Sequence, residues 1–519
     1  MTSLTTKKMS FMVAEQFREG FYEPNPTTGY VFIGNHIPYA NNDANIISLI
    51  DSTSDEKTIW DNMYAAKKIT GNDVEFVVPR VNWTANTKYK QYDDKIEIDE
   101  LLTGNVALNV KPMYVYTKSG SVYKCLSNNN SSNSTVEPSG DYTSSNGNIS
   151  TTDGFIWKYM YNIKPSNRFI SDEWLPAPTS TKQYDYSVNN NGVLDGELTT
   201  VIVTNAGSGY FNNDLAVEEF LTACSILTLS NTTNVAANMA VSGTGILPGA
   251  YITLIDPSNN LITISSPTIS AGGGTSANQL SIKTRIYFDG DGSNTAEATP
   301  VYNGNTISSV TITKIGVGYS RANAYVYGTG TNANLRCIIS PKYGHAHNPA
   351  IELGGTNIMV AMKIGEIDST EVGKIPANTT FRQYGIFVNP HKYGDANVVS
   401  PVNANVVISQ TTDISLVAGS SYILGELVYQ GVDITPANTR AHGYVIEQTS
   451  SIAKVTNVQG AFTFGSPLKG YSSATERQVI SVSTPEFQPY SGDIIHVENA
   501  AKTTRIDGQA ENIKMIVKF

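Results

Sequence analysis

The sequence predicts a mainly β protein with a few short helices, organised as a β-sandwich-like core that carries inserted all-β modules. Three observations lead to this fold class. The chain has 519 residues, which is too long for one ordinary hydrophobic core. Apolar residues make up 40% and charged residues only 15% of it, a balance typical of a folded protein. It is also rich in Gly, Asn, Ser, Thr and Tyr, and these residue types favour strands and turns over helices.

Changes in residue composition along the chain predict where the core is interrupted. We expect the first part of the core in residues 1–195, an insertion in 196–335, the second part of the core in 336–400, a small inserted β domain in 401–484, and C-terminal core strands in 485–519. Both predicted insertions contain short Thr-, Ser- and Asn-rich strands separated by glycines. The flanking segments contain longer apolar strands, so they are assigned to the core.

Two segments carry helix signals. Residues 7–22, KKMSFMVAEQFREGFY, are compatible with a short helix that ends at Gly20. The clearer signal begins at Thr53, which has Glu56 three residues later in the spacing of a capping box. Apolar residues then follow at helical spacing: Ile59, Trp60, Met63 and Ala66.

Alternation of apolar and polar residues predicts the core strands. The segments 29–35 and 74–79 are predicted as strands near the N-terminus, the second of them ended by Pro79. The last residues, ENIKMIVKF, place Ile513, Met515 and Val517 on one face, and predict a half-buried strand. The polar residues 127–153 are predicted to be a long surface loop between two apolar strands.

A glycine-rich motif occurs twice with an offset of 109 residues. GELTTVIVTNAGSGYFNNDLAV at 196–217 aligns with NTISSVTITKIGVGYSRANAYV at 305–326. The aligned pairs include Gly207 with Gly316, Gly209 with Gly318, and Tyr210 with Tyr319. The pattern predicts a strand, a glycine turn that permits positive φ, and a tyrosine that folds back over the sheet.

A phosphate-binding interpretation of this motif fails. A dinucleotide fingerprint needs a third glycine and a following helix. Asn212 and Arg321 stand where that glycine would be, and no helical periodicity follows. The repeat is therefore interpreted as one structural module built twice.

Other candidate sites are weak as well. His345 and His347 have a spacing found in zinc sites but no third ligand nearby. DGDGSN at 289–294 lacks the glycine and the glutamate of a calcium loop and fits a hairpin turn better. Gly373 with Lys374 lacks the earlier glycine of a P-loop. The sequence therefore predicts no catalytic residue, no cofactor and no bound metal.

Charge and cysteine content limit the partners. The net charge is −10 without clustered Lys and Arg, so we expect no nucleic-acid partner. No signal-peptide pattern and no run of eighteen apolar residues is present, so we expect no membrane insertion and synthesis in a cytoplasm. The cysteines Cys125, Cys224 and Cys337 are expected to be buried free thiols.

Three aromatic residues raise a sugar-binding alternative. Tyr116, Tyr123 and Trp157 lie around the polar loop in a pattern that loosely resembles small chitin- and cellulose-binding modules. Aromatic residues in apolar runs are more often core residues than exposed stacking platforms, and these three lie in such runs. The core interpretation is favoured, and glycan binding stays open as an alternative.

Six segments, taken in order, resemble the baseplate wedge subunit of T-even-type contractile-tail bacteriophages, the gene product 8 family. They cover about a fifth of the chain and lie within the segments assigned to the core. The two predicted insertions are largely additional to this resemblance. The segments are 30–41, 76–89, 122–126, 134–163, 381–390 and 490–519.

The resemblance implies a structural virion protein of the tail baseplate that is assembled in the host cytoplasm. It implies a homodimer that contacts other wedge proteins, of the types called gene products 6, 7 and 10, and whose contacts rearrange when the sheath contracts. It implies no catalytic residue and no cofactor. Two alternatives remain open, namely a glycan-binding adhesin at the host surface and a tail-associated depolymerase.

Overall fold

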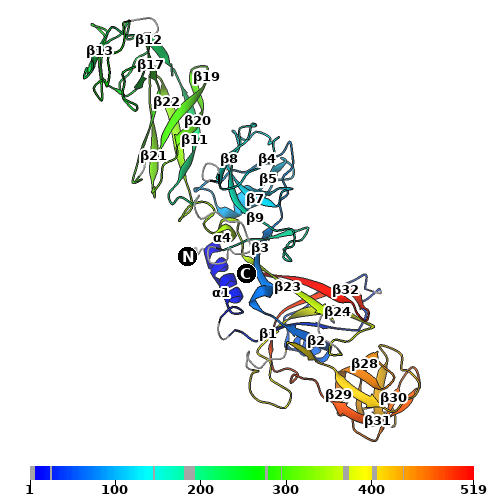
Figure 1. The fold of residues 1–519 in the computed structure, drawn as a ribbon. Helices are drawn as coiled ribbons and strands as arrows, with labels where there is room; N and C mark the ends of the chain where they lie inside the picture. The colour runs from blue at the N-terminus through cyan, green and yellow to red at the C-terminus, as the bar shows by residue number, and fades with distance from the viewer. Residues whose placement is uncertain are drawn as a thin grey trace, which may run out of the picture.

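The computed structural model confirms a mainly β protein with short helices and several antiparallel sheets. The molecule is elongated, both termini lie near its middle, and β modules extend toward both ends (Figure 1). The structure describes residues 6–23, 26–41, 43–143, 147–179, 193–274, 279–293, 295–365, 373–399, 406–436 and 438–519.

Two antiparallel sheets form the central sandwich. The first has the order β25-β2-β1-β24-β32 and the second the order β10-β3-β23-β33. The strands of the first sheet are β25 (Val407–Ser409), β2 (Met63–Lys68), β1 (Gly29–Gly34), β24 (Thr379–Val388) and β32 (Asp493–Arg505). Those of the second are β10 (Trp174–Pro176), β3 (Val74–Pro79), β23 (Asn357–Gly365) and β33 (Ala510–Lys518).

The two sheets share one hydrophobic core. Val31 of β1, Phe76 of β3 and Met515 of β33 belong to the same buried cluster. The helix α1 (Lys7–Glu19) closes this core, since the ring of Phe11 stacks on that of Phe76 at 4.7 Å between centroids. Segments from both ends of the chain therefore build a single layered body.

The predicted C-terminal strand is confirmed. β33 pairs with β23 from residue 510 to residue 518. Ile513 and Met515 are buried while Lys514 and Lys518 are exposed, as the alternation requires. This pairing fixes the C-terminus in the middle of the molecule (Figure 1).

The helix predicted with Thr53 as its capping residue is shorter than expected, and its N-cap lies one residue earlier. α2 spans Thr53–Asp61, and its N-cap is Ser52, whose Oγ accepts from the Asp55 amide at 3.1 Å. The prediction that Met63 and Ala66 continue the helix is wrong. Both lie in β2, a strand between β1 and β25 whose Met63–Ala66 part is buried on both faces, so apolar residues occur there without alternation.

A smaller β lobe follows the first part of the core. Its sheet has the order β6-β7-β9-β8, and β4 pairs in parallel with β5 beside it. The polar stretch 127–153 is not simply a loop, because it ends in β8, which pairs with β9; residues 144–146 lie outside the described residues. The elements are β4 (Lys88–Tyr89), α3 (Ile98–Leu102), β5 (Val110–Lys111), β6 (Tyr114–Tyr116), β7 (Ser121–Ser127), β8 (Asn148–Ser150) and β9 (Ile156–Asn162). The short η1 (Gly71–Asp73) precedes β3.

The region 196–335 contains two separate hydrophobic cores. We call the unit that contains both glycine-tyrosine motifs the Gly-Tyr subdomain. Its strands are β11 (Leu198–Ser208), β18 (Arg285–Gly290), β19 (Glu297–Asn303), β20 (Thr306–Lys314), β21 (Ala322–Tyr327) and β22 (Thr331–Ile339). A second small β unit is inserted between β11 and β18. Its strands are β12 (Asn213–Ala216), β13 (Ile226–Thr228), β14 (Ala240–Ser242), β15 (Ile252–Asp256), β16 (Leu261–Ile264) and β17 (Gln279–Lys283).

The region after β25 forms a closed barrel with the order β26-β29-β28-β27-β30-β31. It has its own apolar core, which includes Ile414, Val428 and Val455. The start of the predicted insertion, residue 401, lies outside the described residues. The strands are β26 (Thr412–Leu416), β27 (Leu427–Gly431), β28 (Thr439–Gln448), β29 (Ile452–Gly460), β30 (Pro467–Gly470) and β31 (Glu476–Ser483).

The two copies of the glycine-tyrosine motif interlock. The Tyr210 amide donates to the Asn305 carbonyl at 3.0 Å, and the Tyr319 amide donates to the Gly196 carbonyl at 3.2 Å. In each bond the motif tyrosine of one copy donates to the first aligned residue of the other copy. In addition, β11 of the first copy pairs with β22, which follows the second copy. The two copies therefore form one unit and not two independent modules.

Each motif tyrosine is buried against glycines that the alignment of the motif did not include. A Cβ on Gly330 would lie 2.5 Å from the Tyr210 ring, and a Cβ on Gly292 would lie 2.5 Å from the Tyr319 ring. Both glycines belong to a second repeat with an offset of 38 residues, YFDGDG at 287–292 and YVYGTG at 325–330. The absence of a side chain is what lets the rings lie flat on the backbone.

Candidate functional site

Four buried charged side chains lie where the small β lobe, the Gly-Tyr subdomain and the core meet. Lys124 of β7 and Lys158 of β9 are directly opposite each other in the strand register. Their exposed fractions are 0% and 1%, so both ammonium groups are removed from water. Two like charges in such a pair destabilise a sheet unless other groups neutralise them.

Each lysine is neutralised by a glutamate from a different segment. Lys124 Nζ pairs with the carboxylate of Glu352, which ends the short helix α4 (Pro349–Glu352). Lys158 Nζ lies 3.5 Å from Oε2 of Glu197. Glu197 is the residue immediately before β11. We call Lys124, Lys158, Glu197 and Glu352 the junction cluster. Its formal charges sum to zero, and its members lie on three parts of the chain that are distant in sequence.

His345 and Tyr92 complete the surroundings of the Lys124–Glu352 pair. The Tyr92 ring lies 4.8 Å from Lys124 Nζ and contacts the His345 ring edge-on at 4.8 Å. Burial, aided by the neighbouring Lys124 charge, lowers the pKa of His345 to about 3, so this imidazole is neutral at neutral pH. His345 Nδ1 is 3.9 Å from Glu352 Oε2.

The two members of the central pair hold each other in the charged state. Burial lowers the pKa of Lys124, and Glu352 opposes this shift. Burial is the largest influence on the pKa of Glu352 and raises it, but Lys124 and His345 together outweigh burial, and the pKa lies below its ordinary value. Removing one partner would leave the other as an uncompensated buried charge, which typically destabilises a protein by about 3–5 kcal/mol.

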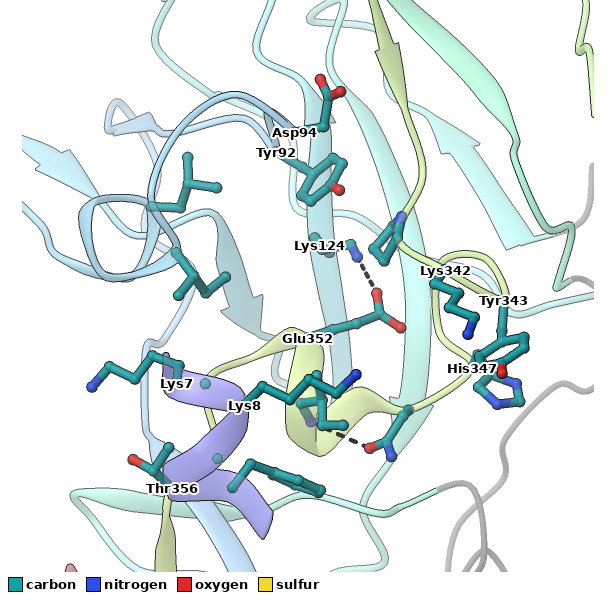
Figure 2. Close-up of a pocket in the computed structure, with 18 of the residues that line it drawn as sticks. Lys7, Lys8, Tyr92, Asp94, Lys124, Lys342, Tyr343, His347, Glu352 and Thr356 are labelled. Carbon is teal, nitrogen blue, oxygen red and sulfur yellow. Dashed lines mark hydrogen bonds and ion pairs between the residues drawn. The ribbon is translucent and has the colours of Figure 1, made fainter. Parts of the chain in front are cut away.

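A cavity of about 510 Å³ opens beside this pair (Figure 2). Its walls come from α1, the segment before α3, β7, the chain after β22, and α4. Apolar lining residues include Phe11, Ile98, Leu101 and Ile351. Figure 2 shows Lys7 and Lys8 on one side and Lys342, Tyr343 and His347 on the other, with the Lys124–Glu352 pair between them.

The central ion pair of this cavity is engaged within the protein. Lys124 has no exposed surface and its ammonium is bound to Glu352. At the rim, Lys7 pairs with Asp99 at 3.2 Å. A group that acts on a substrate must be able to reach it, so the pair serves to join segments of the chain. The cavity itself can accept an apolar group.

The two histidines considered as zinc ligands have different environments. His345 is buried beside Glu352, whereas His347 is partly exposed at the cavity and its ring lies 5.0 Å from that of Tyr343. Within the described residues, no group of three or more His, Cys, Asp or Glu side chains is placed to hold a metal ion.

The segment considered as a calcium loop holds one of the two Gly-Tyr turns. Asp291 Oδ1 accepts from the amides of Ser320 at 2.9 Å and Arg321 at 3.1 Å. The Ser320 hydroxyl donates to the other carboxylate oxygen of Asp291. This bond has the largest effect and, together with the two amide bonds, lowers the pKa of Asp291 to about 2. Asn294 of this segment lies outside the described residues. Lys374, considered as part of a P-loop, donates instead to Glu486 at 2.7 Å.

The aromatic residues considered for sugar stacking are core residues. Tyr123 and Trp157 have no exposed surface and belong to the core of the small β lobe. Tyr116 is partly buried under the guanidinium of Arg80, 4.9 Å from the ring centroid. Tyr123 and Trp157 are therefore not part of a stacking platform, because a ligand cannot reach their faces.

The cysteines are free, but they differ in burial. Cys125 and Cys337 are buried as predicted, whereas Cys224 is only partly buried, so the prediction is wrong for that residue. None of the helices in the described residues has the length and apolar character required to cross a bilayer.

No protein-family model matches the chain, and no curated protein matches its sequence. Sequence reasoning also missed the junction cluster. Its signal was present, since Lys124 and Lys158 each interrupt an otherwise apolar strand, in SVYKCL and FIWKYM.

Proposed function

We propose that the chain is a structural virion protein of a phage tail baseplate wedge. The observation that carries the proposal is where the six segments of the resemblance lie. Segments 30–41, 381–390 and 490–519 contribute β1, β24 and β32, which are neighbours in one sheet. The segment 76–89 contributes β3 to the second sheet, opposite them in the same core. Four of the six segments thus meet in the central sandwich, and the other two, 122–126 and 134–163, contribute strands to the small β lobe.

The regions without the resemblance project from this body. The Gly-Tyr subdomain and the barrel lie toward opposite ends of the molecule (Figure 1). Such a division fits a subunit whose central body would hold a fixed place in an assembly while the projecting modules reach other surfaces. A particle subunit also needs rigid β layers with large lateral surfaces, which this architecture provides.

Exposed apolar patches supply surfaces for protein partners. In the irregular segment before α2, Ile46 is 46% exposed, Ile47 59% and Ile50 71%. At one end of the barrel, Val432 is 78% and Phe464 77% exposed. Their loops are adjacent, because Gln430 Nε2 donates to the Thr463 carbonyl at 2.9 Å. Clusters of exposed apolar side chains mark interaction sites in soluble proteins. The proposal assigns them to a second copy of the chain and to other wedge proteins.

Co-assembly tests this proposal. The purified chain is expected to be a dimer by size-exclusion chromatography with light scattering and to co-elute with wedge proteins expressed from the same genome. A double Ile47→Asp, Ile50→Asp variant should weaken at least one of these associations, with Lys57→Ala as the matched surface control. A monomer that binds no wedge protein would contradict the proposal.

The alternative of a glycan-binding adhesin is favoured by one specific observation. A face of exposed tyrosines lies on the Gly-Tyr subdomain, at a site different from the one considered in the sequence.

A further inference from the structure

Two tyrosines form an exposed aromatic face on the Gly-Tyr subdomain. Tyr287 of β18 and Tyr325 of β21 are directly opposite each other in the strand register, and their ring centroids are 6.4 Å apart. They are 38% and 46% exposed. The ring of Tyr327 lies 6.3 Å from that of Tyr287 and extends the face. The first two occupy equivalent positions of the 38-residue repeat, so the repeat itself places them side by side.

Polar side chains flank the rings at both ends. The Arg285 guanidinium lies 5.1 Å from the Tyr287 ring and 4.1 Å from the Tyr251 ring of the neighbouring β unit. Two residues beyond Tyr287, Asp289 is exposed opposite Asn323, which is exposed as well. Alternation along a strand puts residues two apart on the same face. From Arg285 to Asp289 this face extends for about 13 Å along the strand.

We propose that this face binds a neutral oligosaccharide. Pyranose rings present C–H groups that stack on tyrosine, and hydroxyl groups at the ring edge that carboxylate, amide and guanidinium groups can bind in pairs. The face offers both kinds of contact, with the rings in the middle and the polar groups at the ends. Its length fits a chain of more than one sugar ring.

The chemistry of the face favours a sugar over other ligands. Among the described positions of this face on β18 and β21, Arg285 is the only cation and Asp289 the only anion, whereas single-stranded nucleic acid requires a positively charged groove beside the stacking rings. The face positions on the two strands carry only aromatic and polar side chains: Arg285, Tyr287, Asp289, Asn323, Tyr325 and Tyr327. The apolar end of the barrel, with Val432 and Phe464, has instead the composition expected of a protein contact.

This inference goes beyond the proposed wedge function and does not depend on it. The face lies on a peripheral subdomain, and not on the central sandwich or the small β lobe, which contain the six segments (Figure 1). The full chain should bind at least one member of an array of neutral oligosaccharides, including fragments of bacterial surface polysaccharides. Saturation-transfer NMR with that glycan should show transfer from tyrosine ring protons to the sugar.

A double Tyr287→Ala, Tyr325→Ala variant should weaken binding by roughly tenfold or more, as the loss of a stacking aromatic does elsewhere. The Tyr287→Phe, Tyr325→Phe variant keeps the stacking faces and should retain most of the affinity. Tyr471→Ala, which removes a 60% exposed tyrosine from the barrel, is the matched control and should leave binding unchanged.

Three results would overturn the proposal. The folded protein could bind no glycan on the array, or bind one equally well after both tyrosines are replaced by alanine. Alternatively, the face could bind a thymidine oligonucleotide and not a glycan. The double alanine variant should still assemble with wedge proteins, so a failure of glycan binding and a failure of the wedge proposal are distinguishable.

Discussion

At the junction cluster, buried charges join segments that are distant in sequence, whereas in the Gly-Tyr subdomain two tyrosines packed against glycines join them. Lys124 and Lys158 need their glutamates because an unpaired ammonium in the interior is strongly unfavourable. Tyr210 and Tyr319 depend mainly on space for their rings, which the glycines under the rings provide. Each buried lysine therefore requires a carboxylate at its ammonium group, whereas each tyrosine requires a space that fits its ring. The comparison predicts that mutations at the two sites differ in how they can be rescued.

The largest effect is expected at the junction cluster. Lys124→Met leaves Glu352 buried without its cation and should reduce the free energy of unfolding of the small β lobe by about 3–5 kcal/mol. Hydrogen exchange of the β7 and β9 amides measures this, with the barrel amides as the internal control.

A second substitution sharpens the same comparison. Lys124→Met combined with Glu352→Leu removes both charges and should recover most of the lost stability, because an apolar pair can replace a buried ion pair. If Lys124→Met alone lowers the free energy of unfolding by less than about 1 kcal/mol, the Lys124–Glu352 pair is not a principal contact.

The next largest effect is expected in the Gly-Tyr subdomain. Tyr319→Ala leaves a cavity above Gly292 and should destabilise this subdomain by about 3 kcal/mol, measured by exchange of the β11 and β22 amides. Tyr319→Phe keeps the ring but removes the hydroxyl that accepts from the Ala296 amide at 3.2 Å, and should lose only about 1 kcal/mol. Equal losses in the two variants would contradict packing as the main contribution of this residue.

A smaller effect is expected from pH, and it distinguishes the charged site from the tyrosine site. The folded pKa of His345, about 3, is below its ordinary value, so the unfolded chain takes up the proton first as the pH falls. Stability is therefore complete above about pH 6.5 and decreases below it, by at most about 1.4 kcal/mol per pH unit for this group.

The matched variant for this pH dependence is His345→Phe. The difference in unfolding free energy between wild type and variant should depend on pH between 6 and 4.5, and the dependence should be confined to the junction. If the two proteins show the same pH dependence over this range, His345 is not buried in its neutral form.

The smallest effect is expected at the rim of the cavity. The Lys7 and Asp99 side chains are 45% and 53% exposed, so Lys7→Ala should change stability by no more than about 0.5 kcal/mol. Thermal unfolding of this variant should overlay that of the wild type. A large loss would mean that the N-terminal end of α1 contributes more to the junction than its ion pair indicates.

The fold class was predictable because short-range patterns determine it. The alternation around Ile513 and Met515 identified β33, and the apolar run VEFVVP identified β3. The same method failed at Met63 and Ala66, where a strand buried on both faces has no alternation and its apolar residues match helical spacing by chance. The capping residue was missed by one position because Ser52 and Thr53 have similar side chains.

The junction cluster was harder to predict, for a physical reason. A lysine in an alternating strand normally faces water, and only the segment that covers that face makes it a buried charge. Glu352 is more than two hundred residues away from Lys124 in the sequence, and no local pattern connects them. The second repeat, with its glycines Gly292 and Gly330, was different, because its offset of 38 residues is visible in the sequence itself.

The measurement that tests the central claim most directly is the position of the chain in an intact tailed particle. Antibody fragments raised against the barrel and against the Gly-Tyr subdomain would be imaged separately on particles by cryo-electron microscopy. The account predicts that both labels appear at the baseplate, at two distinct positions repeated around the tail axis. Labels that are absent from the baseplate, or found only on the tail tube or the capsid, would contradict it.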